Sequence, residues 1–177
     1  MKSTISLCMI VKDEEKLLSS CLESVKIIVD QMIIVDTGSK DRTIQIAKNF
    51  GADVYQFPWC DNFSKARNES IKYAIGDWIL WMDADETLDP KSIPELKKIT
   101  NVKNKDKFYS VSISSKNEYQ NKVNYSDAHR LFPNGLGIQF ENRIHEQIHH
   151  SAKKAGAREV TTGIHIIHEG YNLTEEE

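Results

Sequence analysis

The chain has 177 residues, with 23 Lys and Arg against 26 Asp and Glu and a formal net charge of -3. Hydrophobic residues make up 40% and charged residues 28% of the chain, which are ordinary globular values. One domain usually takes about 100–200 residues, so we expect a single domain over residues 1–177. The lack of a basic excess argues against a nucleic-acid partner, because neutralising phosphates requires a cationic face.

The cysteines and the N-terminus indicate the compartment. Cys8, Cys21 and Cys60 are odd in number and form no Cys-x-x-Cys motif, which favours a reducing environment. The apolar run Ile5–Val11 is too short to span a membrane and has no cleavage-site pattern. We therefore predict a cytoplasmic protein and leave peripheral membrane contact open. The acidic ending at residues 171–177 is consistent with the N-terminal piece of a longer protein.

The first ninety residues alternate between two kinds of segment. Short apolar runs predict strands at Ile5–Val11, Met32–Val35, Asp53–Gln56 and Trp78–Met82. Between them, amphipathic segments predict helices within Glu14–Val25, from an Asp41 cap to Phe50, and from a Ser64 cap to Ala74. Strands that alternate with short helices predict βαβ units, and hence an α/β fold with a mostly parallel sheet and helices on both faces.

The pattern changes after residue 90. A helix is predicted at Pro90–Thr100, followed by strands at Phe108–Ser114, Ala128–Phe132 and Val160–His168. We expect this smaller part to be more antiparallel. All six histidines lie in it, and no linker divides the chain.

Three carboxylates follow the fourth predicted strand. The segment Trp78–Leu88 reads WILWMDADETL, in which Asp83, Asp85 and Glu86 directly follow the apolar run. Ligands of open α/β sheets bind outside the carboxyl ends of strands, and two carboxylates so spaced can share a divalent cation that holds a diphosphate. A solvated acidic loop is the alternative. It is disfavoured because a carboxylate beside a buried strand requires a cation or hydrogen-bond donors.

Other polar residues are placed to join this centre. Asp36 ends the second predicted strand before a Gly-Ser turn, where it could accept bonds from a ribose or a base, whereas Asp41 is better explained as a helix cap. Glu14 lies in an acidic cluster that could equally stabilise a helix N-terminus. Arg67 lies one turn into its helix, facing either the sheet edge or solvent. His168 shares a strand face with apolar residues and could come up beside the pair Asp83 and Asp85.

Four segments resemble, in sequence and in order, glycosyltransferase family 2, the inverting nucleotide-sugar enzymes with a GT-A (Rossmann-like) fold. They read ISLCMIVKDEEKLLSSCLESV, IIVDTGSKDRT, DNFSKARNESIKYAIGDWILWMDADE and RIHEQI. The resemblance covers nearly the whole chain. It is strongest to the bacterial branch that includes lipopolysaccharide-core transferases and peptide S-glycosyltransferases.

The resemblance implies a role for each matching residue. The nucleoside, expected to be uridine, would contact Glu14, Asp36 and Asp61, and Arg67 would lie near the diphosphate or hold Asp61. Asp83 and Asp85 would flank Mn²⁺ or Mg²⁺. His168 is a further candidate ligand on separate grounds, because it closes the last predicted strand. Glu146 would be the general base, with His145 as runner-up. Residues 1–90 would then bind the nucleotide-sugar donor, and residues 91–177 would complete the metal site and bind an acceptor glycan, lipid-linked glycan or peptide.

Two departures and two alternatives accompany this interpretation. Asp13 stands where the family commonly has Asn, which puts in doubt a turn role for that side chain, and the acceptor-side elements are short. A non-catalytic nucleotide-sugar or glycan-binding module is one alternative. A phosphohydrolase is the other, since Asp83–Thr87 matches a DxDxT motif. The phosphohydrolase is disfavoured because the only later aspartates after Asp89 are Asp106 and Asp127, which are far apart, and because the motif is not on the first strand.

Overall fold

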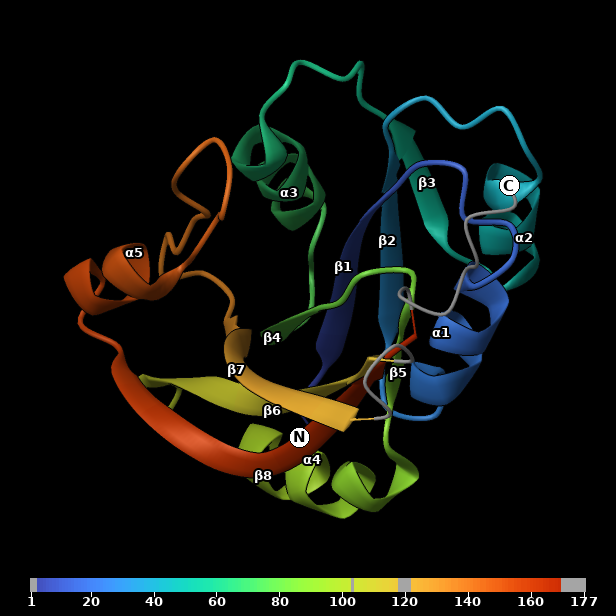
Figure 1. Cartoon of the computed structure of the whole chain (residues 1–177). Helices are drawn as coiled ribbons and strands as arrows, with labels where there is room; N and C mark the ends of the chain where they lie inside the picture. Colours follow the sequence, from blue (N-terminus) through green and yellow to red (C-terminus); the bar gives the residue numbers. More distant parts are fainter. Residues whose placement is uncertain (1–2, 103, 118–121, 170–177) are drawn as a thin grey trace.

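The computed structural model describes residues 3–102, 104–117 and 122–169 (Figure 1). One sheet of eight strands, in the order β3-β2-β1-β4-β7-β6-β8-β5, runs through the molecule. Because strands from both parts of the chain belong to this one sheet, the described residues form one continuous architecture.

The first part of the chain forms the parallel half of the sheet. Its strands are β1 (Ile5–Val11), β2 (Gln31–Asp36), β3 (Asp53–Gln56) and β4 (Trp78–Trp81), and β1 pairs in parallel with both β2 and β4. The connecting helices are α1 (Leu18–Val25), α2 (Thr43–Asn49) and α3 (Phe63–Lys72). This alternation confirms the predicted α/β fold, and α3 lies on the opposite side of the strands from α1 and α2 (Figure 1).

Two apolar layers cover the faces of the sheet. On one face, alternate residues of β1 such as Leu7 and Met9 pack with Leu22 of α1. On the other face, Cys8 packs with Ile79 and Trp81 of β4, and Ile71 of α3 lies against them. The period-2 alternation of β1 therefore supplies both layers, because successive side chains of a strand point to opposite faces.

The second part of the chain adds the remaining strands. After β5 (Glu86–Leu88) come a 3-10 turn (Pro90–Ser92) and α4 (Ile93–Thr100), then β6 (Lys107–Asn117), β7 (Lys122–Pro133), α5 (His149–Lys154) and β8 (Arg158–His168). Strand β7 pairs antiparallel with β4 and β6, and β5 pairs antiparallel with β8, whereas β6 and β8 are parallel. The expected antiparallel character is thus present, with one parallel exception.

Some local predictions were wrong. Helix α3 begins at Phe63 and its cap is Asn62, whose side chain accepts the Lys65 backbone N–H at 3.0 Å; Ser64 instead donates its hydroxyl to the Asn142 carbonyl. The helix also ends at Lys72 instead of Ala74. Strand β5 and helix α5 were not predicted, because segments of three and six residues carry too little periodicity.

The strand pairing places the functional segments at one edge. Val11 at the end of β1 pairs with Asp36 at the end of β2, and β4 ends next to β1 before Asp83. The predicted meeting of Asp36 and Asp83 along the same edge of the sheet is therefore confirmed. Among the described segments, none of the helices combines the length and apolarity that a bilayer crossing requires.

Gly76, in the turn before β4, offers a test of this packing. A Cβ added at Gly76 would lie 2.7 Å from the Ser6 backbone nitrogen. We expect Gly76→Ala to lower the free energy of unfolding by about 1–3 kcal/mol, the usual cost of overpacking. Urea denaturation measures this loss. In the matched control Gly163→Ala, the added Cβ meets chiefly the flexible Glu95 carboxylate. A Gly163→Ala loss as large as that of Gly76→Ala would contradict the packing described.

Candidate active site

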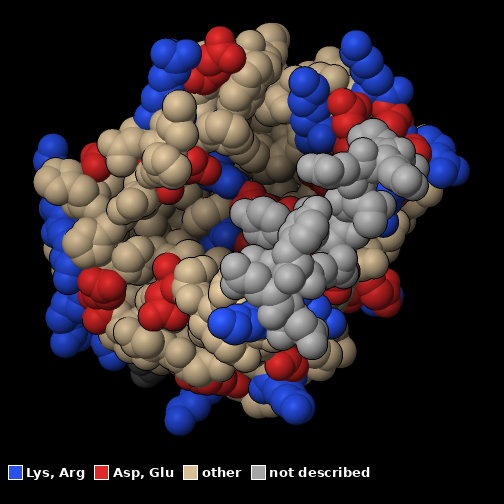
Figure 2. Space-filling model, in the orientation of Figure 1, with Lys and Arg blue, Asp and Glu red and all other residues tan. Residues whose placement is uncertain are grey.

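A cavity of about 350 Å³ opens at the edge where these strands end. Figure 2 shows this face hollowed, with acidic and basic side chains gathered on the floor of the hollow. The cavity walls come from the ends of β1, β2 and β8, the start of α3 and the segment after β4. The lining residues are Ile10, Val11, Lys12, Glu14, Thr37, Trp59, Phe63, Arg67, Asp83, Ala84, Asp85 and His168.

Asp83 is held by two guanidinium groups. Arg67 Nη2 donates to Asp83 Oδ1 at 2.7 Å, and Arg130 Nη1 lies 3.5 Å from Oδ2. Burial favours the neutral carboxyl, but the charges of Arg67 and Arg130 outweigh it and lower the pKa of Asp83 to about 2. The compensating donors expected beside this carboxylate are therefore two arginines, and Asp83 is ionised throughout the neutral range.

Arg67 also reaches the predicted general base. Its Nε donates to Glu146 Oε1 at 2.6 Å, and its guanidinium lies 4.2 Å from the centre of the Trp81 ring. The predicted alternative, in which Arg67 holds Asp61, was wrong: within the described residues its ion pairs are with Asp83 and Glu146. The Glu146 side chain is 12% exposed and lies in an irregular segment, so it is largely shielded from solvent.

A second buried ion pair lies behind Asp83, and the sequence reasoning missed it. Arg130 Nη2 donates to Glu86 Oε1 at 2.6 Å, and both side chains are at most 5% exposed. Glu86 Oε2 in turn accepts the backbone N–H of Asp83 at 2.9 Å. The available signal was an arginine in the middle of the apolar run Ala128–Phe132, because a buried charge requires a partner.

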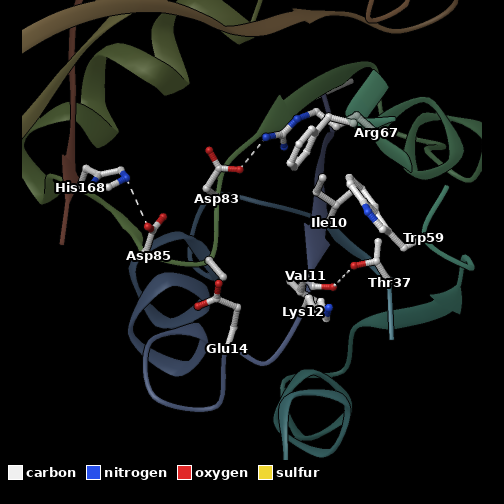
Figure 3. A pocket seen from close by; sticks show the side chains of 12 residues that line it. Ile10, Val11, Lys12, Glu14, Thr37, Trp59, Arg67, Asp83, Asp85 and His168 are labelled. Atoms are coloured by element: carbon white, nitrogen blue, oxygen red, sulfur yellow. Dashed lines mark hydrogen bonds and ion pairs between the residues drawn. The ribbon is translucent and has the colours of Figure 1, made fainter. Parts of the chain in front are cut away.

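Asp85 lies beside His168, as predicted. His168 Nε2 is 3.2 Å from Asp85 Oδ2, at the point where β5 and β8 pair (Figure 3). Neighbouring donors around an octahedral cation lie about 3 Å apart, since each is about 2.1 Å from the ion. The Asp85–His168 pair therefore fits two ligand positions of Mn²⁺ or Mg²⁺. Within the described ranges no three His, Cys, Asp or Glu side chains form such a group by themselves.

Glu14 lies on the same side of the cavity as the two aspartates (Figure 3). Burial, followed by the charges of Asp85 and Asp83, raises the pKa of Glu14 to about 7. Its backbone N–H donates to Thr43 Oγ1 at 2.7 Å, which fixes the segment after β1 against the start of α2. Glu14 thus lies near the carboxylate cluster, and burial together with these neighbouring charges disfavours its anionic form.

Asp36 has a structural task that was not foreseen. It is 2% exposed, and its carboxylate accepts the backbone N–H groups of Gly38 and Ser39 at 3.1–3.2 Å. Thr37, the next residue, lines the cavity in its place. Asp13 accepts the Lys40 backbone N–H at 2.7 Å, so this side chain does hold a turn despite departing from the family's Asn.

Asp61 lies on the rim, 74% exposed, and joins the cavity through an aromatic neighbour. Trp59 Nε1 donates to Asp61 Oδ1 at 3.0 Å, and the Trp59 ring meets Phe63 edge-on at 4.8 Å. Both rings line the cavity although each is 39% exposed. Sequence reasoning placed Asp61 here but missed this aromatic wall, whose signal was two aromatic residues flanking Asp61.

The segment 141–147 is fastened to the start of α3. Phe63 donates its backbone N–H to the Arg143 carbonyl at 3.1 Å, and Arg143 Nε donates to the Asp61 carbonyl at 2.5 Å. His145 is exposed, and neither His145 nor Glu146 lines the cavity directly; Glu146 contacts the lining residue Arg67. Of the four described non-glycine residues with positive φ, Asp61, Asn142 and His145 lie in this region and Asp13 lies after β1. Strained backbone of this kind gathers at functional sites.

The comparisons with known proteins agree with this geometry. The family model of glycosyl transferase family 2 matches residues 6–172. The chain belongs to glycosyl transferase family 2. The predicted family, GT-A-like fold and transferase class are therefore confirmed, and the match favours a transferase over the phosphohydrolase alternative.

Two relatives illustrate the range of proteins that carry this domain. A TPR repeat-containing protein of Synechococcus elongatus is 42% identical over 144 residues, which are 81% of this chain and 35% of the relative. The SPbeta prophage-derived glycosyltransferase SunS of Bacillus subtilis is 31% identical over 180 residues, covering 97% of this chain and 41% of the relative. The chain thus spans less than half the length of these relatives.

Solved structures share the fold at low identity. S. aureus TarS 1-349 in complex with UDP superimposes with a TM-score of 0.70 at 16% identity, covering 93% of this chain and 60% of that one. Glucosyl-3-phosphoglycerate synthase from Mycobacterium tuberculosis, in complex with Mn²⁺, UDP and phosphoglyceric acid, gives a TM-score of 0.52 at 23% identity, covering 66% and 45%.

The raised pKa of Glu14 predicts a pH-dependent stability. An acid whose pKa increases on folding, here from 4.5 to about 7, favours the folded state at low pH, and this contribution disappears as the pH rises through the higher value. Glu14→Gln removes the titration. Without divalent cations, its free energy of unfolding relative to wild type should increase between pH 4.5 and about 7, as urea denaturation can measure.

Glu15→Gln is the matched control for this experiment. The pKa of Glu15 is lowered by hydrogen bonds from Arg42, so the neutral variant should gain nothing over the same pH interval. An equal gain from both variants would show that the general surface charge, and not the cavity, determines the effect.

Proposed function

We propose that this domain is a metal-dependent, inverting glycosyltransferase that transfers a sugar from a UDP-sugar to an acceptor. The observation that carries the proposal is the line of contacts from Asp83 through Arg67 to Glu146 at the cavity edge of a family 2 chain. It joins the strand-end carboxylate Asp83, which lies next to the proposed metal ligand Asp85, to an acid suited to the acceptor. We assign residues 1–90 to donor binding and residues 91–177 to the acceptor and metal.

The donor proposal rests on the end of the cavity formed by β1 and β2. Glu14 lines the cavity there, and Asp36 holds the turn that presents Thr37. Asp61 would contact the nucleoside from the rim, beside the Trp59 ring. The complexes of S. aureus TarS with UDP and with UDP-GlcNAc, which share this fold, support a uridine nucleotide.

For the metal, we propose Asp85 and His168 as direct ligands and Asp83 as a weaker candidate. Both oxygens of Asp83 already face arginines, whereas Asp85 and His168 have the separation of two cation ligands. A bound Mn²⁺ or Mg²⁺ would act as a Lewis acid that stabilises the leaving diphosphate. The fold likeness to the synthase solved with Mn²⁺ and UDP supports this choice.

The reaction requires that the acceptor nucleophile lose a proton while it attacks the anomeric carbon opposite the leaving diphosphate. We propose that Glu146 accepts this proton. Arg67 engages Oε1, which leaves Oε2 to receive it and keeps the carboxylate oriented. His145 is the second candidate. Arg67 contributes positive charge between the acceptor side and the diphosphate side, where negative charge develops on the leaving group.

The acceptor remains a class: a glycan, a lipid-linked glycan or a peptide. A non-catalytic nucleotide-sugar-binding module is the alternative function, because the chain spans only part of its relatives' length. We propose a cytoplasmic site of action, in keeping with Cys8, Cys21 and Cys60 as free thiols. Slow hydrolysis of a UDP-sugar in the presence of Mn²⁺ separates the two functions. A binding module would bind UDP without any turnover.

Replacing the proposed general base should strongly lower turnover and leave donor binding unchanged. Glu146→Gln keeps the shape of the side chain, and we expect turnover to fall by about 10²–10⁴-fold with UDP affinity retained. Release of UDP measures turnover, and calorimetry measures affinity. Glu141→Gln, an exposed glutamate of the same segment, should behave like wild type. Normal turnover by Glu146→Gln, with an inactive His145→Ala, would assign the base to the histidine.

Replacing the metal ligand should act on the cation instead. Asp85→Asn removes a carboxylate charge at the Asp85–His168 pair, so we expect Mn²⁺ affinity in the presence of UDP to weaken by about tenfold or more. Calorimetric titration with Mn²⁺ measures this affinity. Asp127→Asn, on an exposed part of β7, is the control and should leave it unchanged. Full Mn²⁺ affinity in Asp85→Asn would rule out the assignment.

A further inference from the structure

Arg130 is a buried cation with two acidic partners from different parts of the cavity floor. Its side chain is 5% exposed on β7, Nη2 donates to Glu86 Oε1 at 2.6 Å, and Nη1 lies 3.5 Å from Asp83 Oδ2. Glu86 Oε2 accepts the Asp83 backbone N–H at 2.9 Å. The Arg130–Glu86 pair therefore holds Asp83 by its main chain and by its side chain at once.

We infer that Arg130 is a positioning residue for the transfer reaction, acting on Asp83 and, through Asp83, on the guanidinium of Arg67. This inference rests on the proposed function. Arg67 spans 2.7 Å to Asp83 and 2.6 Å to Glu146, so the position of Asp83 determines where Arg67 lies relative to the base. A displacement of about 1 Å in such a group can cost about 10²-fold in rate.

Core packing alone gives no reason for a guanidinium at this position. The next residues of β7, Leu131 and Phe132, are fully buried and apolar. Replacing a buried ion pair by apolar side chains of similar volume is often neutral or stabilising. What the guanidinium adds over an apolar residue is its contact with Glu86 and Asp83.

Trp81 contacts both arginines through its ring. The guanidinium carbons of Arg130 and Arg67 lie 3.6 Å and 4.2 Å from the centre of the Trp81 ring. The indole Nε1 donates to the carbonyl of His129, the neighbour of Arg130, at 2.6 Å. A planar guanidinium can stack on this ring and bind a carboxylate at the same time, whereas an ammonium cannot do both in this geometry. Lysine is therefore an informative replacement, because it keeps only the charge.

The first experiment compares three proteins: wild type, Arg130→Lys and the control Arg158→Lys. Arg158 is 68% exposed and pairs with Asp106 away from the cavity, so it is a matched control. We expect Arg130→Lys to remain folded, to lose about 10–100-fold in kcat/KM for the UDP-sugar, and to bind UDP with Mn²⁺ about tenfold more weakly. Arg158→Lys should match wild type in both. Wild-type kcat/KM and UDP affinity in Arg130→Lys would overturn the inference.

A second experiment separates positioning from stability. Arg130→Met leaves Glu86 without its cation and should destabilise the fold, whereas the double variant Arg130→Met, Glu86→Gln removes both charges and should recover the urea midpoint. We expect turnover and UDP affinity to stay low in the double variant. Their recovery together with stability would reduce Arg130 to a structural role. A wild-type chain that binds UDP but turns over no nucleotide sugar would defeat the proposed function, while the UDP affinities would still decide the role of Arg130.

Discussion

A chain of alternating charges beneath the cavity is the interaction on which the site depends. It runs Glu146–Arg67–Asp83–Arg130–Glu86, with four ion pairs between 2.6 and 3.5 Å. Each of these charges would be costly to bury alone, so removing one partner of a pair should destabilise the fold. This chain of charges links four separate parts of the sequence: the segment after β4, α3, β7 and the segment 141–147. Because Asp83 is its middle member, the segment after β4 and the segment 141–147 share one electrostatic support.

The sheet topology makes this chain of charges possible. In the parallel half, βαβ connections bring the ends of β1, β2 and β4 to one edge, which places Glu14, Asp36 and Asp83 there. The antiparallel β7 then pairs with β4 and lays Arg130 behind Asp83. The short β5 pairs with the end of β8 and sets Asp85 against His168. The two halves of the chain therefore contribute different partners to one cavity, and neither half alone contains the full set.

The parallel half could be predicted from the sequence because its signals are local. Apolar runs and helical periodicity fixed the four strands within two residues, and the edge position of Asp36 and Asp83 followed from the βαβ rule. The partners of the charges could not be predicted, because they depend on pairings between distant segments: Arg67 with Glu146, and Arg130 with Glu86. Asp36 shows a different limit. Its place was right, but its carboxylate is occupied by the turn that it precedes.

The charge balance of the cavity explains why a cation and a diphosphate would suit it together. Burial and the neighbouring carboxylates Asp85 and Asp83 raise the pKa of Glu14, which means that this side of the cavity carries more negative charge than its donors can stabilise. Within the described residues, the ion pairs of Arg67 and Arg130 are with Asp83, Glu146 and Glu86, and not with Glu14. A divalent cation at Asp85 and His168 would supply the missing positive charge and favour the ionised form of Glu14. A diphosphate bound in this cavity would be attracted by such a cation, so binding of metal and of nucleotide should reinforce each other.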